Sequence, residues 1–302
     1  MPVTKVFYGW RLVAAGGALQ FLQSLLLNQA FGVYVAVLVE ERGWSKTALS
    51  GAAALKSTEV ALLGPVLGWM VDRFGAQGII RSRPEDHGET IDGLPPAPPP
   101  VKGQPEAPGQ RMFTAREALR TSAFWFFSIG HALSLLVVQA VNVHAITHIK
   151  EGLGYTLAQA TFVFVLVTAG QFVGVMLGWV IGEKFDKRLV CAACMLLHSA
   201  GLLMMTYATG PVMLVAAALV HGTAWGLRGP FMQAIRADYF GRRSIGMIIG
   251  LSALITVFGQ IGGPLIAGAF ADWTGDYRAG FTLLAGLSGV GSLFFLMAKP
   301  PR

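Results

Sequence analysis

Charged residues are scarce in this sequence. Asp, Glu, Lys and Arg make up 13% of its 302 residues, whereas hydrophobic residues make up 54%. A soluble domain carries about a quarter charged residues, so the composition excludes an ordinary soluble protein and predicts a membrane protein. The net charge of +7 does not indicate a nucleic-acid partner, because the basic residues lie in short segments between apolar runs rather than on one polar face.

Cysteine is scarce too, and motifs of catalytic sites are lacking. Cys191 and Cys194 lie inside an apolar run without the βαβ context or accessible thiolate of a redox C-x-x-C site, so we expect them to pack as small hydrophobic residues. His144 and His148 have the i, i+4 spacing of a metal pair, but no third ligand shares their face. Without a nucleotide-binding loop or a nucleophile elbow, we expect no enzyme activity, no cofactor and no metal.

Apolar runs long enough to cross a membrane are abundant. Crossing about 30 Å of hydrocarbon takes roughly 20 apolar residues in a helix. Eight runs qualify: 12–39, 47–71, 123–147, 157–181, 189–208, 213–235, 246–270 and 279–298. Backbone groups in lipid need partners within their own segment, so we expect an all-α membrane protein with about eight transmembrane helices.

The basic residues indicate how these helices are oriented. If both termini are cytoplasmic, the outer side holds four Lys or Arg residues and the inner side holds seventeen. The inner residues are Lys5, Arg11, Arg73, Arg81, Arg83, Lys102, Arg111, Arg116, Arg120, Lys184, Lys187, Arg188, Arg236, Arg242, Arg243, Lys299 and Arg302. Because Lys and Arg concentrate on the cytoplasmic side, this excess predicts a multi-pass protein of a plasma or inner membrane, with both termini cytoplasmic.

A proline-rich segment separates the second run from the third. Seven prolines fall between residues 95 and 108, which predicts an extended cytoplasmic linker over residues 82–122. The linker either only connects or also binds a PxxP-recognising partner. Thr114 and Glu117 form a capping box that begins a short helix before the third run. The chain is thereby divided into a two-span part, residues 1–81, and a six-span part, residues 123–302.

A charged turn is repeated at the end of two apolar runs. Residues 67–75 read LGWMVDRFG and residues 177–186 read LGWVIGEKFD, so both contain Leu-Gly-Trp and an acid–base pair. A repeated span with its turn indicates a duplicated membrane bundle. The copies start 110 residues apart, whereas two intact six-helix halves would separate them by roughly 200.

The first copy resembles the signature loop of the major facilitator superfamily, G-x-x-x-D-R-x-G. The matching residues are Gly68, Asp72, Arg73 and Gly75. The basic residues that should follow are replaced by Ala76, Gln77 and Gly78. The segments 8–10 (YGW), 238–243 (DYFGRR) and 272–277 (DWTGDY) resemble the monocarboxylate-transporter-like branch of the superfamily.

The resemblance implies a secondary transporter that moves small organic anions with protons by alternating access between two six-span halves. It also implies a gating role for the signature loop, with its acid near the start of another helix and near Arg242 and Arg243. Since only two spans precede the linker, we expect spans three to six to be absent, with the junction near residues 77–82. The alternatives are a true eight-span family or a non-transporting remnant, scaffold or accessory protein. An incomplete bundle would expose polar side chains to lipid, which favours a homo-oligomer.

Charges inside the spans are the first site candidates, because a charge in a bilayer is energetically unfavourable. Lys56 and Glu59 at i, i+3 can pair on one helix face. Glu59 either accepts a coupling proton while Lys56 holds the substrate, or the two form a structural ion pair. Arg228 either grips a carboxylate bidentately or snorkels to the cytoplasmic interface.

Polar side chains on cavity-lining spans are the second group of candidates. The resemblance implies that the first, third and sixth apolar runs line the cavity. Their candidate residues are Gln23, Asn28, His131, Asn142, His221, Trp225 and Arg228. His221, Trp225 and Arg228 share one helix face. His221 either relays protons or is a buried histidine bonded to a neighbouring helix.

Overall fold

The computed structural model of this chain describes residues 19, 30–79, 112–182, 184–241 and 243–301. Within these residues the regular elements are all helices, as the apolar runs predicted. They are α2 (Ala30–Arg42), α3 (Lys46–Ile79), α4 (Ala115–Leu119), α5 (Ser122–Thr147), the π-helical turn η4 (His148–Gly152), α6 (Leu157–Ile181), α7 (Lys187–Thr206), α8 (Pro211–Phe240), α9 (Ile245–Thr274) and α10 (Arg278–Met297).

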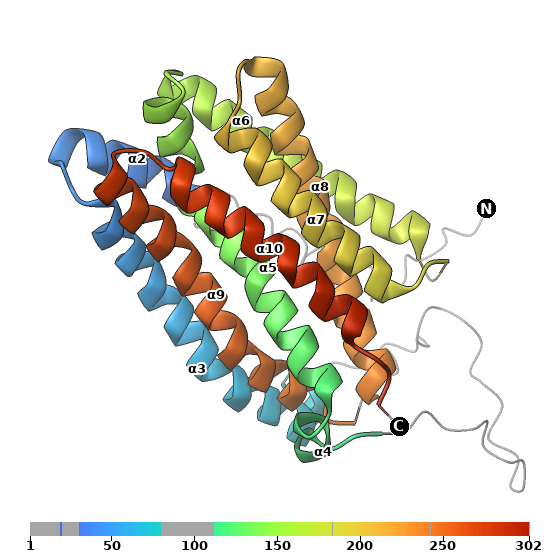
Figure 1. Cartoon of the computed structure of the whole chain (residues 1–302). Helices are drawn as coiled ribbons and strands as arrows, with labels where there is room; N and C mark the ends of the chain where they lie inside the picture. Colours follow the sequence, from blue (N-terminus) through green and yellow to red (C-terminus); the bar gives the residue numbers. More distant parts are fainter. Residues whose placement is uncertain (1–18, 20–29, 80–111, 183, 242, 302) are drawn as a thin grey trace, which may run out of the picture.

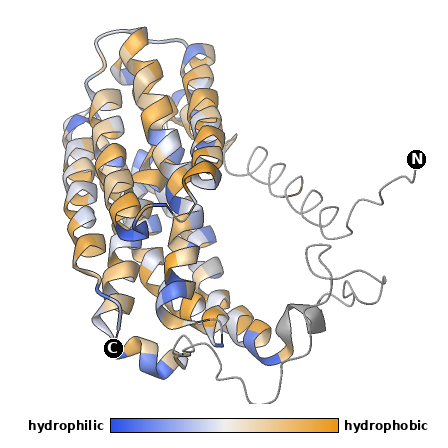
Figure 2. Cartoon of the chain, turned by 90° about the vertical axis from the view of Figure 1, so that its right-hand side faces the viewer, coloured by the Kyte–Doolittle hydropathy of each residue, from blue (hydrophilic) through white to orange (hydrophobic). Residues whose placement is uncertain are grey.

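Six of the described helices are long and apolar enough to cross a membrane, namely α5 with η4 and α6 to α10. They correspond to the last six predicted spans, with boundaries close to those expected. Figure 2 shows them as largely hydrophobic along their lengths. The second predicted span corresponds to α3, which has 34 residues but also contains Lys56, Glu59, Asp72 and Arg73 and is not among the six. Most of the first predicted span lies outside the described residues.

The helix starts follow local capping chemistry. Thr114 and Glu117 form the predicted capping box of α4, with Glu117 N donating to Thr114 Oγ1 at 3.3 Å and Thr114 N donating to Glu117 Oε2 at 2.8 Å. A second capping box, Thr156 with Gln159, begins α6. Asp186 begins α7, and its hydrogen bonds from Arg188 hold the pKa of Asp186 below its ordinary value. These caps satisfy backbone donors that a helix start leaves open.

α5 and α10 lie in the middle of the helix bundle, between two groups of helices. α3 lies along α9 on one flank, and α6, α8 and α7 form the other, as Figure 1 shows. α5 contacts both α9 and α10, and α2 rests against α5. Buried apolar side chains fill the interior in two main clusters, one around Ile146, Phe164 and Phe281 and the other around Phe124, Phe231 and Phe295.

Glycine permits close contact within the outer helix pairs. In α6, a Cβ on Gly170 would lie 2.8 Å from the carbonyl oxygen of Leu219, and one on Gly174 would overlap the carbonyl of Thr223, both in α8. These two residues belong to the small-residue face that membrane helices use to approach each other. In return, a Cβ on Gly226 of α8 would overlap the backbone of α6. The glycines therefore fix the distance between α6 and α8.

Candidate functional site

Arg228 lies inside the helix bundle. It stands twelve residues before the end of α8, about 18 Å along the helix. Only 2% of its surface is exposed, so its guanidinium does not snorkel to the cytoplasmic end. Its Nε and Nη1 are buried and have no hydrogen-bond partner among the described residues. Buried guanidinium donors without acceptors are energetically unfavourable, which makes this position a candidate for an anionic ligand.

Arg236, two turns further along α8, is also buried, at 3% exposure. Its Nη2 donates to Ser252 Oγ of α9 at 2.8 Å and lies 3.2 Å from His131 Nδ1 of α5. Ser128 Oγ completes this group by donating to Ser252 Oγ at 2.9 Å. The apolar runs placed Arg236 just beyond the sixth predicted span, whereas α8 continues to Phe240 and keeps Arg236 within the bundle.

His221 pairs with a histidine that was not among the predicted site residues. Its Nδ1 lies 3.3 Å from Nδ1 of His198 on α7, and both side chains are fully buried. Within the part of the chain that the structure describes, the Nε2 atoms of both rings have no hydrogen-bond partner. A hydrogen bond at this distance requires one Nδ1 to carry the proton and the other to accept it. The sequence feature that could have indicated His198 as a site residue is its position as a single histidine within an apolar run.

These residues form one cluster between α5, α7 and α8, which we call the arginine–histidine cluster: Arg228, Arg236, His131, His198 and His221. His221, Arg228 and Arg236 follow one another along α8, and His198 of α7 and His131 of α5 bond to the first and the last of them. Among the residues whose burial is described, no buried side chain is an Asp or Glu. The cluster is therefore cationic with no buried carboxylate to balance it in the described part of the chain.

Of the other cavity candidates, two are described and two lie outside the described residues. Asn142 is buried, with its Nδ2 3.5 Å from Gln139 Oε1 and its own Oδ1 unpartnered. Trp225 is half-buried and packs on the apolar core. Gln23 and Asn28 are not described.

Lys56 and Glu59 lie away from the cluster. Both are on the exposed side of α3, among exposed apolar residues such as Leu55 and Leu62. The structure therefore does not bring them together with Arg228.

Asp72 of the signature loop binds the start of another helix. Its carboxylate accepts hydrogen bonds from Gly246 N at 2.9 Å and from Met247 N at 2.7 Å, at the N-terminus of α9. A carboxylate there satisfies free donors and complements the helix dipole. Gly68 makes the approach possible, because a Cβ there would overlap the backbone of Gly246. The structure therefore contains the expected contact between this acid and the start of another helix.

The positions of the other predicted gating residues are as follows. Arg73 and Arg243 are exposed. Gly75 lies in α3, and Arg242 is outside the described residues.

An equivalent contact joins the same two helices at their other ends. Asp272, near the end of α9, accepts from Lys46 N at 3.2 Å, Thr47 N at 3.0 Å and Thr47 Oγ1 at 2.7 Å, at the start of α3. α3 and α9 are thus antiparallel, and each helix caps the N-terminus of the other. Residues 68–75 and 268–275 share the spacing G-x-x-x-D-x-x-G, a second repeat that was not among the predicted motifs.

Losing either carboxylate should weaken the α3–α9 pair. We expect Asp72→Ala and Asp272→Ala each to lower the free energy of unfolding by about 1 kcal/mol, as for other N-cap losses. The two sites are about 39 Å apart along α3, so the effects should add in the double variant. Thermal unfolding in detergent measures this. Glu41→Ala, at an exposed carboxylate of α2 outside the pair, is the control. A double variant no weaker than either single one would contradict independent clamps.

His144 and His148 are bonded to protein groups rather than gathered at a metal site. His144 Nε2 lies 2.8 Å from Ser50 Oγ and 3.1 Å from the Pro264 carbonyl, and its Nδ1 lies 3.1 Å from Tyr277 Oη. His148 Nε2 lies 3.4 Å from the Met205 carbonyl. Among the described residues, no three His, Cys, Asp or Glu side chains are grouped to hold a metal ion.

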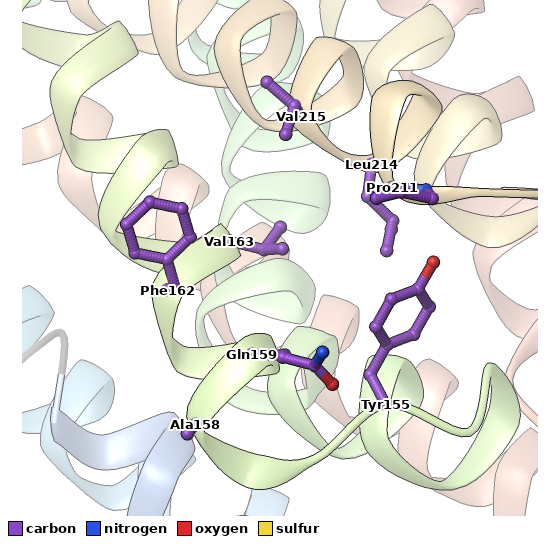
Figure 3. A pocket seen from close by; sticks show the side chains of 8 residues that line it. All are labelled: Tyr155, Ala158, Gln159, Phe162, Val163, Pro211, Leu214 and Val215. Atoms are coloured by element: carbon purple, nitrogen blue, oxygen red, sulfur yellow. The ribbon is translucent and has the colours of Figure 1, made fainter.

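A hollow of about 390 Å³ opens between the starts of α6 and α8. Figure 3 shows its lining, in which Tyr155 and Gln159 are the polar side chains and the others are apolar. None of the predicted site residues lines it. Its chemistry therefore does not suit a charged ligand.

Long apolar helices enclosing a cationic cluster define this chain as a multi-pass α-helical membrane protein. Residues 98–302 match the family model described as Major Facilitator Superfamily, and the chain belongs to that family. The members of this family are membrane transporters rather than enzymes.

The chain is also similar to two monocarboxylate transporters and one solved transporter. It is 24% identical to monocarboxylate transporter 13 of Bos taurus, over 95% of this chain and 75% of that protein. It is 27% identical to human monocarboxylate transporter 11, over 78% of this chain and 52% of that protein. A bacterial homologue of the human lysosomal transporter Spinster aligns at 16% identity and a TM-score of 0.43, over 83% of this chain and 64% of that one. The chain thus spans about half of the human relative.

Proposed function

We propose that this chain acts in secondary transport of small organic anions, with Arg228 binding the anion at the centre of the membrane. The observation that carries the proposal is the buried Arg228 guanidinium with two unpartnered donors. An anion would supply the missing acceptors and balance the charge, which an apolar interior cannot do. The names of the two curated relatives agree with a carboxylate as substrate.

Uptake into proteoliposomes tests this proposal. The purified chain is reconstituted and the entry of radiolabelled lactate is followed with and without an inward proton gradient. We expect saturable uptake that the gradient accelerates. Folded protein that carries no anion under either condition would rule out the proposed function for this chain.

The histidine pair supports coupling to protons. His221 stands about two turns before Arg228 on α8, and its Nδ1 lies 3.3 Å from Nδ1 of His198. A second proton would make the pair cationic next to Arg228, which is unfavourable until an anion arrives. Anion binding therefore favours proton uptake and, by linkage, proton uptake favours anion binding.

Replacing either histidine should uncouple anion transport from proton transport. His198→Gln and His221→Gln keep hydrogen-bonding capacity but cannot gain a proton in the physiological pH range. We expect uptake by these variants to lose most of its acceleration by an inward proton gradient, while exchange of anion across the membrane without a gradient persists. His148→Gln, a buried histidine outside the cluster, is the control. Full acceleration in both cluster variants would exclude the pair as the coupling site.

Alternating access would use the two caps between α3 and α9. Opening the bundle at one end separates one carboxylate from its helix start and keeps the other contact. At the end that carries Asp272, ion pairs between Lys46 and Glu151, at 2.7 Å, and between Lys150 and Glu40 add to the closure. We propose that this end faces outward, with both termini cytoplasmic in a plasma or inner membrane, and that residues 82–122 link parts 1–81 and 123–302.

A second candidate is a non-transporting remnant or accessory protein. It is favoured by the exposed side of α3, where Lys56 and Glu59 stand among Leu55, Leu62 and Leu63. A further helical layer would cover this side, either spans three to six or a second copy of the chain. Measuring the mass of the chain in nanodiscs together with its flux separates the candidates: a homo-oligomer with flux supports transport, and a folded protein without flux supports the second candidate.

A further inference from the structure

The arginine–histidine cluster carries two guanidinium groups. Arg228 and Arg236 lie eight residues apart on α8, about 12 Å along its axis. Arg236 Nη2 lies 3.2 Å from Nδ1 of His131 on α5, and Arg228 stands about two turns before Arg236 on α8, with both arginines buried. The bundle therefore holds two positive groups along one stretch of α8.

The two groups are not equally satisfied by the protein. Arg236 Nη2 is positioned by Ser252 and His131, whereas Nε and Nη1 of Arg228 have no partner. These neutral partners orient Arg236 without neutralising it. With no buried Asp or Glu among the residues whose burial is described, a bound monoanion would balance one guanidinium and leave the other uncompensated.

We propose that the cluster binds dianionic carboxylates, with one carboxylate on Arg228, the other on Arg236, and Ser252 and His131 positioning Arg236. This inference rests on the proposed function and narrows its substrate class from small organic anions to short dicarboxylates. The two guanidinium groups hold opposite ends of the ligand. A dianion brings both negative charges into the site in one binding event.

Binding of succinate and lactate to the purified full chain tests the inference. Both anions are titrated by calorimetry in detergent at neutral pH and matched ionic strength. We expect the Kd of succinate to be at least about tenfold lower than that of lactate, because truncating one partner of a buried charge pair has an effect of this size or larger.

Variants of Arg236 test whether this residue binds the second carboxylate of the dianion. Arg236→Gln should raise the Kd of succinate by about tenfold or more and change that of lactate by less than about threefold. Arg236→Lys keeps the charge and should retain the preference for succinate. The exposed arginine variant Arg116→Gln serves as the control and should leave both values unchanged.

The possible results separate this inference from the proposed function. Wild-type protein that binds lactate as tightly as succinate overturns the dianion site, whether or not the variants fold. If Arg236→Gln raises the Kd of both anions equally, the inference is also overturned, because an equal loss is expected when Arg236 only supports the structure of the site. Folded protein that binds neither anion refutes the proposed function as well.

Discussion

Replacing Arg228 by Gln should reduce anion uptake by at least about thirtyfold, because removing one partner of a buried charge pair costs about 2–5 kcal/mol. Arg228→Lys should lie between wild type and Arg228→Gln, since the ammonium keeps the charge but lacks the planar fork that grips a carboxylate. Initial rates of uptake into proteoliposomes at limiting substrate give these ratios. Arg116→Gln is again the control.

Replacing Arg228 by an apolar residue should raise the stability of the empty protein. The empty protein buries Arg228 with two donors unpartnered, so Arg228→Met should raise the temperature of unfolding measured without substrate. Loss of uptake together with a gain in stability identifies a residue kept for binding. A variant that loses both would show instead that Arg228 supports the fold.

Enlarging the glycines between α6 and α8 should have the largest effect on stability. A Cβ at Gly222 would overlap the carbonyl of Val167, and one at Gly226 would overlap the carbonyl of Gln171. Both obstacles are helix backbone, so the helices must move apart. We expect Gly222→Ala and Gly226→Ala each to destabilise the protein by about 1–3 kcal/mol, in the range for overpacked sites.

Thermal unfolding in detergent checks this expectation, and α8 supplies its own control. Gly229 lies one turn further along the helix, and among the described residues no other helix comes within 4 Å of the position that a Cβ would take there. Gly229→Ala should therefore leave stability unchanged or raise it, because alanine favours helix by about 1 kcal/mol over glycine. Equal behaviour of Gly226→Ala and Gly229→Ala would contradict the close contact.

The sequence was sufficient for the elements that depend on local chemistry. Apolar runs located α5 to α10, and Thr114 with Glu117 located the start of α4, because length, hydropathy and caps are properties of contiguous residues. Asp72 was assigned to a helix start from its resemblance to a known loop. Its partners, Gly246 and Met247, are 174 and 175 residues away.

Contacts between helices were harder to predict from the sequence. Arg236 was assigned to a cytoplasmic segment, since its place inside the bundle depends on where α8 ends and on Ser252 of α9. His198 was overlooked because its importance comes from His221 on the neighbouring helix. The exposed position of Lys56 and Glu59 likewise follows from which face α3 turns toward α9. Charge and spacing within one helix do not determine these pairings.

The antiparallel α3–α9 pair also bears on what happens when no substrate is present. In the proposed transport cycle, a carboxylate clamp at each extremity would stabilise closure at both ends of the bundle, so the empty protein would favour an occluded form. Disengaging one clamp would be a separate energetic step from disengaging the other. Such a protein would resist leaking ions, because a continuous aqueous path would require both contacts to break together.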